Sequence, residues 1–293
     1  MELQQFRYVV AIAEERNFTR AAERCFVVQS ALSHQIKALE KEIGTELFVR
    51  TSRRVELTTA GEAFLIEARA SLTAADRAAL VAAEAVGRVR GTLAVGVIPT
   101  VSAVDIPELV ATFHDAYPEV VLTVHSGGSD EFLRGIGDGT INVGFLGLDT
   151  GTLPAGVDYY ELAQGRHVAV VPAGHELATR SMLNLSELVA EPFIDFPTGS
   201  PGRVQVDNAF SAAGVQRRVA FEAMSIDFML ALVRRGLGVC LLPPGSVPTD
   251  EAVAAVSVQD GPQRTEYLAW DRFNPSPPAR AFVDHVIGEQ LEG

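Results

Sequence analysis

The chain has 293 residues, enough for two or three compact domains, and 47% of them are apolar and 21% charged. Its two cysteines, Cys25 and Cys240, are too few for a disulfide framework and fit a reducing compartment. The opening residues lack the basic and apolar segments of a secretory signal, and no apolar run reaches the ~18 residues of a membrane span. We therefore expect a cytoplasmic globular protein.

Charge is distributed unevenly along the chain, whose formal net charge is −13. Residues 1–58 hold nine basic and eight acidic side chains, a net of +1, which leaves −14 for residues 59–293. A less acidic end is a mild indication of nucleic-acid contact. The clustering of Arg50, Arg53 and Arg54 within five residues is a stronger one.

Apolar residues at helical spacing predict three helices in the first 44 residues. The first spans 3–15, and Thr19 is the expected N-cap of a second that ends at Cys25. We interpret Cys25 as a small core residue rather than a reactive thiol. The third helix is expected over 29–44, with a buried stripe of Leu32, Ile36, Leu39 and Ile43.

The opposite face of the third helix carries short or flexible hydrogen-bonding side chains, namely Gln29, Ser30, Ser33, His34 and Lys37. A glutamine can read adenine through two contacts, and serine or lysine can reach bases or phosphates. The alternative is a merely solvated polar face. The basic segment that follows favours DNA.

Two helices joined by about four residues and followed by a basic hairpin have the layout of a winged helix-turn-helix, which places its second helix in the major groove. The stretch from Phe18 to Gly61 resembles the DNA-binding domain of the LysR-type transcriptional regulators. It contains Ala21-Ala22, Gln29-Ser30-Ala31-Leu32-Ser33, Leu47-Phe48-Val49-Arg50 and Leu57-Thr58. The resemblance implies a DNA-binding domain over 1–58, with contacts from Thr19, Gln29, Ser30, Ser33, His34, Lys37, Arg50, Arg53 and Arg54.

Val28 departs from the family pattern, which commonly has serine or threonine before the glutamine. Valine can neither cap the helix nor hydrogen-bond a phosphate. We expect the cap to be missing, at a cost of about 1 kcal/mol.

Residues 59–90 are rich in alanine and contain no proline, which predicts a long helix. About 30 residues at ~1.5 Å each give a rod of roughly 45 Å. A heptad-like seam runs along it through Leu65, Ala68, Leu72, Ala75, Ala79, Ala82 and Val86. The resemblance implies a linker helix that pairs two subunits antiparallel, with lobe contacts extending the dimer to a tetramer. The alternative is a helix packed on its own domain.

From Gly91 onward, strand-like and helix-like segments alternate, which predicts a parallel α/β sheet. The resemblance implies two α/β lobes with crossing strands, like a periplasmic binding protein. We place lobe I at 91–161 and 268–293, and lobe II at 162–267. The expected fold class is thus a multidomain α+β and α/β chain: a winged helix-turn-helix, a linker helix and a two-lobed effector-binding domain over 91–293.

The sequence favours neither an enzyme nor a cofactor or metal site. Ser200 lacks the flanking glycines of a nucleophile elbow. The glycines at 135, 137 and 139 end a helix, whereas the dinucleotide fingerprint begins one. The histidines show no metal-ligand spacing, and two cysteines are too few for a zinc site.

Ligands of paired α/β lobes bind beyond the carboxyl ends of strands, where helices begin. We expect effector contacts there from Thr100, Val101, Ser102, Ser129, Thr198, Gly199, Ser200 and Met224. Helix N-termini favour an anion. Since neither the stretch at 100–102 nor that at 198–200 contains Arg or Lys, we expect neutral donors to hold it. The alternative is that these hydroxyls only cap helices.

The sequence therefore predicts a sequence-specific DNA-binding transcriptional regulator controlled by an anionic metabolite. Its expected partners are double-stranded DNA with a pseudo-palindromic operator, the effector and further copies of itself; RNA polymerase is another candidate. One rival is a solute-binding module, against which residues 1–58 argue. Another is an architectural DNA binder without a ligand, against which the large acidic α/β part argues.

Overall fold

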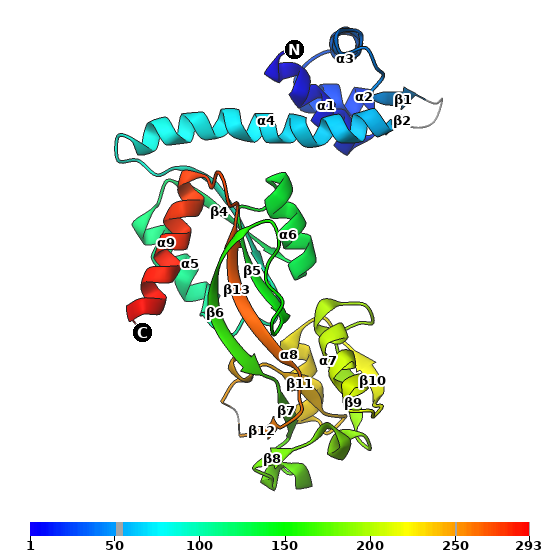
Figure 1. The fold of residues 1–293 in the computed structure, drawn as a ribbon, viewed down its shortest axis with the longest axis vertical. Coiled ribbons are helices and arrows are strands. Elements are labelled where there is room, and N and C mark those ends of the chain that lie inside the picture. Colours follow the sequence, from blue (N-terminus) through cyan, green and yellow to red (C-terminus); the bar gives the residue numbers. More distant parts are fainter. Residues whose placement is uncertain (51–54, 250, 293) are drawn as a thin grey trace. The chain divides into compact units, whose positions relative to one another are not determined.

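The computed structural model describes residues 1–50, 55–249 and 251–292, and its contacts divide the chain into two compact units, Met1–Arg88 and Val89–Gly293 (Figure 1). The first unit is helical with a small hairpin. Its elements are α1 (Leu3–Glu15), α2 (Phe18–Arg24), α3 (Gln29–Ile43), β1 (Phe48–Arg50), β2 (Val55–Leu57) and α4 (Thr59–Glu84).

The core of the first unit forms where α1, α2 and α3 meet the hairpin. Leu32, Ile36 and Leu39 of α3 are fully buried there, as their spacing predicts, and Ile43 packs on the edge. The ring of Phe6 meets that of Phe64 at 5.4 Å, which attaches α4 to α1.

Helix capping confirms one prediction and corrects another. Val28 occupies the N-cap of α3 with no side-chain cap hydrogen bond. Thr19, however, is not the N-cap of α2: Asn17 is, and its Oδ1 accepts from the backbone N–H groups of Thr19 at 2.8 Å and Arg20 at 3.1 Å. Asparagine competes well with threonine for this position, so the helix begins at Phe18.

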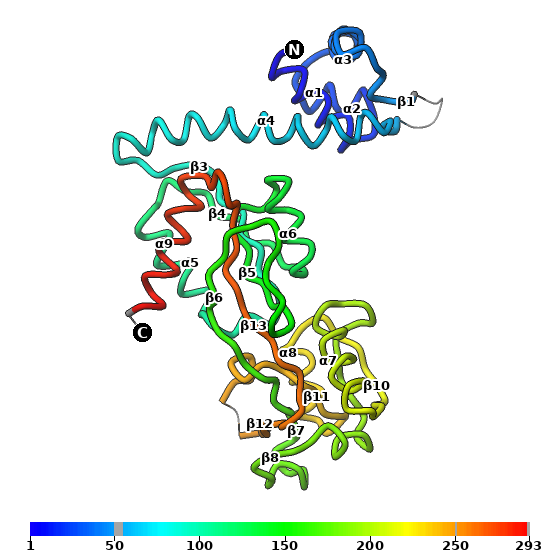
Figure 2. Tube along the Cα trace, viewed as in Figure 1, coloured from blue at the N-terminus to red at the C-terminus, as the bar shows by residue number. Residues whose placement is uncertain are grey.

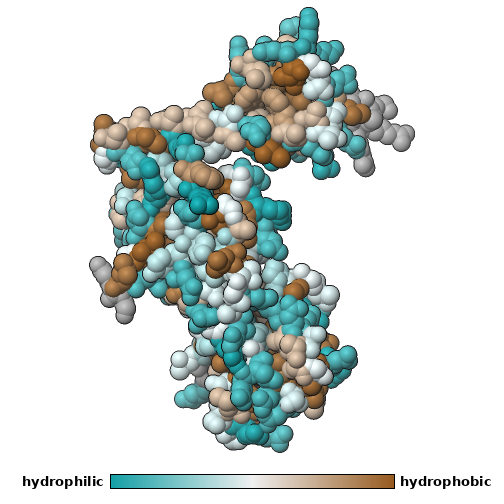
Figure 3. Space-filling view, viewed as in Figure 1, coloured by the Kyte–Doolittle hydropathy of each residue, from teal (hydrophilic) through white to brown (hydrophobic). Residues whose placement is uncertain are grey.

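Helix α4 has 26 residues, about 39 Å at ~1.5 Å per residue, and ends before Val86 of the predicted seam. Only Gly61, Ala68 and Ala83 of this helix are buried. Figure 3 shows that its visible face is largely apolar in colour.

The second unit begins with a five-stranded sheet in the order β4-β3-β5-β13-β6. Its strands are β3 (Gly91–Val97), β4 (Val120–Ser126), β5 (Val143–Asp149), β6 (Asp158–Arg166) and β13 (Gln263–Trp270). Helices α5 (Ile106–Ala116) and α9 (Pro277–Glu292) pack on one face around Phe113 and Phe282, and α6 (Ser129–Asp138) covers the other face (Figure 1).

A second lobe holds a four-stranded sheet in the order β11-β7-β12-β8 and a parallel pair, β9 with β10. Its strands are β7 (Val168–Pro172), β8 (Met182–Leu183), β9 (Pro192–Asp195), β10 (Arg218–Glu222), β11 (Cys240–Leu242) and β12 (Val253–Val258). Its helices are α7 (Pro201–Ala212), α8 (Ile226–Arg234) and the short turns η1 (Glu176–Thr179), η2 (Leu185–Leu188) and η3 (Pro244–Ser246).

The expectation of a parallel sheet is only partly correct. Strands β4, β3 and β5 are parallel, but β13 pairs antiparallel with both β5 and β6. The cause is the double crossing between lobes: the chain leaves the first sheet along β6 and returns along β13, side by side in opposite directions (Figure 2). Because this pairing extends to Gln263 and Arg166, residues 162–166 and 263–267 belong to the first sheet, unlike the lobe limits expected from sequence.

Candidate functional site

The polar face of α3 points away from the core of the first unit. Gln29, Ser30, His34 and Lys37 are exposed, and Ser33 is half-buried. Thr19 is exposed at the start of α2. The face therefore offers amide, hydroxyl, imidazole and ammonium groups in one row to a macromolecule.

Contacts from α3 and α4 hold the start of the hairpin formed by β1 and β2, here called the wing. The carboxylate of Glu40 accepts from the N–H of Leu47 at 2.9 Å and of Phe48 at 3.3 Å. Gly61 lies so close that a β-carbon there would stand 2.0 Å from the Leu47 carbonyl oxygen. Arg50 ends β1, and Arg53 and Arg54 lie outside the described residues.

A cavity of about 340 Å³ opens in the second unit, beyond the carboxyl ends of β3 and β9 and beside the first turns of α6 and α7. Its lining includes four of the effector candidates, Thr100, Ser129, Ser200 and Met224. The remaining wall comes from Ile98, Pro99, Ser126, Gly127, Gly128, Glu131, Gly147, Phe196, Pro201, Gly202, Gln205 and Arg264. Val101, Ser102, Thr198 and Gly199 are not in this lining.

The wall of this cavity also contains a buried cation, which lies outside the two stretches singled out in the sequence. Arg264 of β13 is 5% exposed, and its guanidinium donates to the hydroxyl and the carbonyl oxygen of Thr100. It also pairs with Glu266 at 2.5 Å. These three bonds use three of its five N–H donors.

Glu266 of β13 holds the loop that follows β3 through bonds to Ser102 and Ala103. Its carboxylate accepts from the hydroxyl of Ser102 at 2.5 Å, and from the backbone N–H groups of Ser102 at 2.9 Å and Ala103 at 3.0 Å. Burial raises the pKa of Glu266, but the charge of Arg264 and the Ser102 bonds outweigh burial and lower it. Ser102 thus stabilises the loop and is not part of the cavity lining.

Ser129 begins α6 and is 2% exposed. Its hydroxyl donates to the carbonyl of Gly147 at 3.2 Å and accepts from the N–H of Gly147 at 3.0 Å. The amide of Gln205, from the other lobe, donates to the same carbonyl at 3.4 Å. A direct bond between the lobes therefore lies in the cavity wall.

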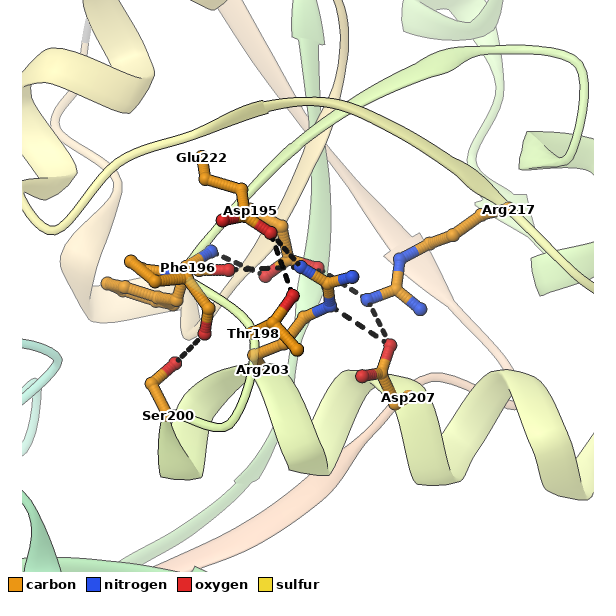
Figure 4. Close-up of polar contacts among 9 residues, drawn as sticks. Asp195, Phe196, Thr198, Ser200, Arg203, Asp207, Arg217 and Glu222 are labelled. Atoms are coloured by element: carbon orange, nitrogen blue, oxygen red, sulfur yellow. Dashed lines mark hydrogen bonds and ion pairs between the residues drawn. The ribbon is translucent and has the colours of Figure 1, made fainter.

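An ionic cluster, shown in Figure 4, holds the loop at 196–200 in place. Asp195 accepts from the N–H of Phe196 at 2.8 Å, and Arg203 donates to the Phe196 carbonyl at 3.1 Å. Arg203 also pairs with Glu222 at 3.1 Å, and that carboxylate accepts from the Thr198 hydroxyl at 2.9 Å. Thr198 is therefore a loop anchor.

The same cluster extends to Arg217, which pairs with Asp195 at 2.5 Å and with Asp207 at 2.8 Å. Its guanidinium lies 4.7 Å from the ring centroid of Phe210, an arrangement that favours the cation. Burial raises the pKa of Asp195, and the hydrogen bond and charge of Arg217 oppose that rise. Phe196, which lines the cavity, is thus held through both its backbone N–H and its carbonyl.

Neither cysteine has the setting of an activated thiol. Cys240 is fully buried, and burial raises its pKa; burial also raises the pKa of Cys25. Among the residues that the structure describes, no group of three His, Cys, Asp or Glu side chains could hold a metal ion. Within those same residues, every helix is too short or too polar to cross a membrane.

Comparison with known proteins decides the family. A model for the LysR substrate binding domain matches residues 87–290, and one for the bacterial regulatory helix-turn-helix protein, lysR family, matches residues 3–62. The chain belongs to the LysR family. It is a DNA-binding transcriptional regulator with an effector-binding domain, and not an enzyme.

Relatives of this LysR-family chain match it over nearly its whole length. The regulator BudR of Raoultella terrigena is 34% identical, covering 97% of this chain and 99% of BudR. The dual regulator OxyR of Escherichia coli K12 is 29% identical, covering 98% and 93%.

Solved structures of the family have the same fold. A full-length OxyR variant from Pseudomonas aeruginosa superposes with a TM-score of 0.74 at 26% identity, covering 98% of this chain and 94% of that one. CbnR in complex with its target DNA gives 0.67 at 28% identity, covering 98% and 99%.

Proposed function

We propose that an anionic small molecule bound in the cavity between the two lobes controls how this LysR-family regulator binds its operator. The observation that carries the proposal is the buried Arg264 beside Thr100 in the wall of one cavity of about 340 Å³. That volume lies within the range of small-molecule sites. The wall is contributed by both lobes, so a ligand would contact both and bias their arrangement.

The chemistry of the wall supports an effector with one anionic group and an apolar body. The guanidinium of Arg264 in the wall and the first turns of α6 and α7 favour a carboxylate or similar anion. Ile98, Phe196 and Met224 supply apolar surface for the remainder. The hydroxyl of Ser129 is already paired with Gly147, so we assign it to positioning the wall.

A metabolite screen by thermal shift tests this site. A ligand at about 100 times its Kd should stabilise the fold by ~2.7 kcal/mol. Met224→Trp, which places a larger side chain in the cavity wall, should remove the shift. Met182→Trp is the matched control, because Met182 is 51% exposed on β8 and not in the lining. A hit that still stabilises both Met224→Trp and Thr100→Val would refute the cavity assignment.

On the DNA side, we propose that α3 enters the major groove and that the wing arginines contact the backbone or a narrow minor groove. The exposed donors on α3 and the complex of CbnR with its target DNA support this docking. A pseudo-palindromic operator needs two copies of the reader, and the sparsely buried α4 is the proposed dimer helix. A regulator of chromosomal genes acts where the DNA is, so we also propose a cytoplasmic location.

Peroxide sensing is a second candidate, since several relatives are named hydrogen peroxide-inducible genes activators. Peroxide chemistry requires an accessible thiolate. The raised pKa values of Cys25 and Cys240 and the burial of Cys240 oppose it. We therefore expect operator binding to be unchanged by hydrogen peroxide.

A further inference from the structure

Phe26, in the turn between α2 and α3, has a backbone conformation that large side chains rarely adopt. Its φ is 56°, in the left-handed region. The N–H of Phe26 donates to the Glu23 carbonyl and that of Val27 to the Ala22 carbonyl, each at 3.0 Å. This pair of bonds ends a helix in a Schellman motif, whose left-handed position normally holds glycine or asparagine. A phenylalanine there is unfavourable for the fold.

Burial of the Phe26 side chain does not compensate for this backbone conformation. It is 95% exposed, the largest exposed fraction among the large apolar side chains that the structure describes. The next residue, Val27, packs against the core of the first unit. The turn therefore packs the valine against the core and directs the ring outward into solvent.

The position of the ring suggests what covers it. Phe26 lies three residues before Gln29, at the N-terminal end of α3, where helix-turn-helix proteins contact base edges. Val28, the uncapped N-cap of α3, is also exposed, at 68%. Two exposed apolar side chains thus stand next to the row of donors that begins with Gln29 and Ser30.

We propose that Phe26 contacts operator DNA and reads the C5-methyl group of a thymine at the edge of each half-site. The inference rests on the proposed docking of α3 in the major groove. A phenyl ring offers no hydrogen bond to a phosphate, and the thymine methyl is the apolar feature that the major groove presents. The favourable free energy of this contact would offset the unfavourable left-handed backbone conformation of Phe26.

The test begins with a duplex selected from a random library by the full-length chain, with affinity measured by fluorescence anisotropy. Each thymine is then replaced in turn by deoxyuracil, which removes only the methyl group. At one position per half-site, the parent should lose about fourfold in affinity, the effect of one buried methyl-sized group. In Phe26→Asn, deoxyuracil at that position should have no effect, while its effects elsewhere remain.

The stability of the variant separates a DNA contact from a structural role. Because asparagine tolerates the left-handed region, Phe26→Asn should melt at a temperature equal to or above that of the parent while binding the operator more weakly. Phe273→Asn is the matched control: Phe273 is 79% exposed in the second unit, and its replacement should leave DNA binding unchanged.

Three results would overturn the proposal. In the first, Phe26→Asn binds the operator as tightly as the parent. In the second, the deoxyuracil effect at the assigned position persists in that variant. In the third, no thymine shows a deoxyuracil effect that depends on Phe26. The third result would indicate that Phe26 contacts a protein partner or the sugars of the DNA instead of a thymine methyl. Failure of the docking itself looks different, because Gln29→Ala would then also bind the selected duplex like the parent.

Discussion

Gly61, in the first turn of α4, allows this helix to pack closely against the wing. A β-carbon at this position would stand 2.0 Å from the Leu47 carbonyl oxygen and 3.0 Å from Leu57 Cδ2. Gly61→Ala should destabilise the first unit by roughly 1–3 kcal/mol, since the hairpin must move. Urea unfolding measures the change.

The control for that substitution is Gly137→Ala. Gly137 lies inside α6 with no atom within 4 Å of an added β-carbon, so alanine should stabilise that helix by up to ~1 kcal/mol. Equal unfolding free energies for Gly61→Ala and the parent would contradict the close packing at the wing.

His167, at the first crossing between the lobes, should make stability depend on pH. Its Nδ1–H donates to the Pro262 carbonyl at 3.2 Å, and burial together with the charge of Arg264 lowers its pKa to about 4. An unfolded histidine takes up a proton near pH ~6.5. The stability that neutral His167 contributes is therefore complete above pH ~6.5 and is lost as the pH falls toward about 4.

At pH 5 this loss should be about 2 kcal/mol relative to pH 7.5. His167→Gln keeps an N–H donor but cannot titrate, so its unfolding free energy should fall less over the same range. Denaturant titrations at both pH values measure the difference. Parallel pH profiles for the parent and the variant would remove His167 as the cause.

Helix α4 should pair the two subunits of a dimer. Leu72 is half-buried on the predicted seam, and Leu72→Glu would place a charge within it. The variant should sediment as a smaller species than the parent. Ala74→Glu adds the same charge on the exposed opposite side of the helix and should leave the assembly unchanged. If Leu72→Glu sediments like the parent, the seam is misassigned.

The reading helix and the wing should differ in what they contribute to operator binding. Gln29→Ala should cost ~1–3 kcal/mol at one base pair, because a base contact is lost. Arg53→Ala should weaken binding to every sequence and lower the salt slope by about one, because a phosphate contact is lost. Anisotropy titrations over a salt series distinguish the two. Parental affinities in both variants would contradict the docking.

Elements that depend on neighbouring residues could be predicted from the sequence, whereas those that depend on distant residues could not. The helices over 3–15 and 29–43 follow from their apolar spacing, and the missing cap at Val28 follows from its side chain. The antiparallel pairing of β6 and β13 could not be predicted, because it arises from two crossings about a hundred residues apart. The position of Arg264 in the cavity wall could not be predicted for the same reason, because its contact with Thr100 spans 164 residues.

Ligand binding in the cavity and operator binding by the first unit should be thermodynamically coupled. A ligand that changes operator affinity must bind the DNA-bound and free forms with different affinity, and the coupling is reciprocal. Gln205 and Gly147 join the lobes within the cavity wall, so a ligand there meets a contact that depends on lobe arrangement.

The most direct test is operator affinity, measured by anisotropy with and without a hit from the thermal-shift screen. In the parent and in Met182→Trp, the ligand should change the operator Kd by about fivefold or more. In Met224→Trp, the operator Kd without ligand should match the parent, and the ligand should not change it. The same ligand-induced change in Met224→Trp as in the parent would contradict the claim that this cavity controls DNA binding.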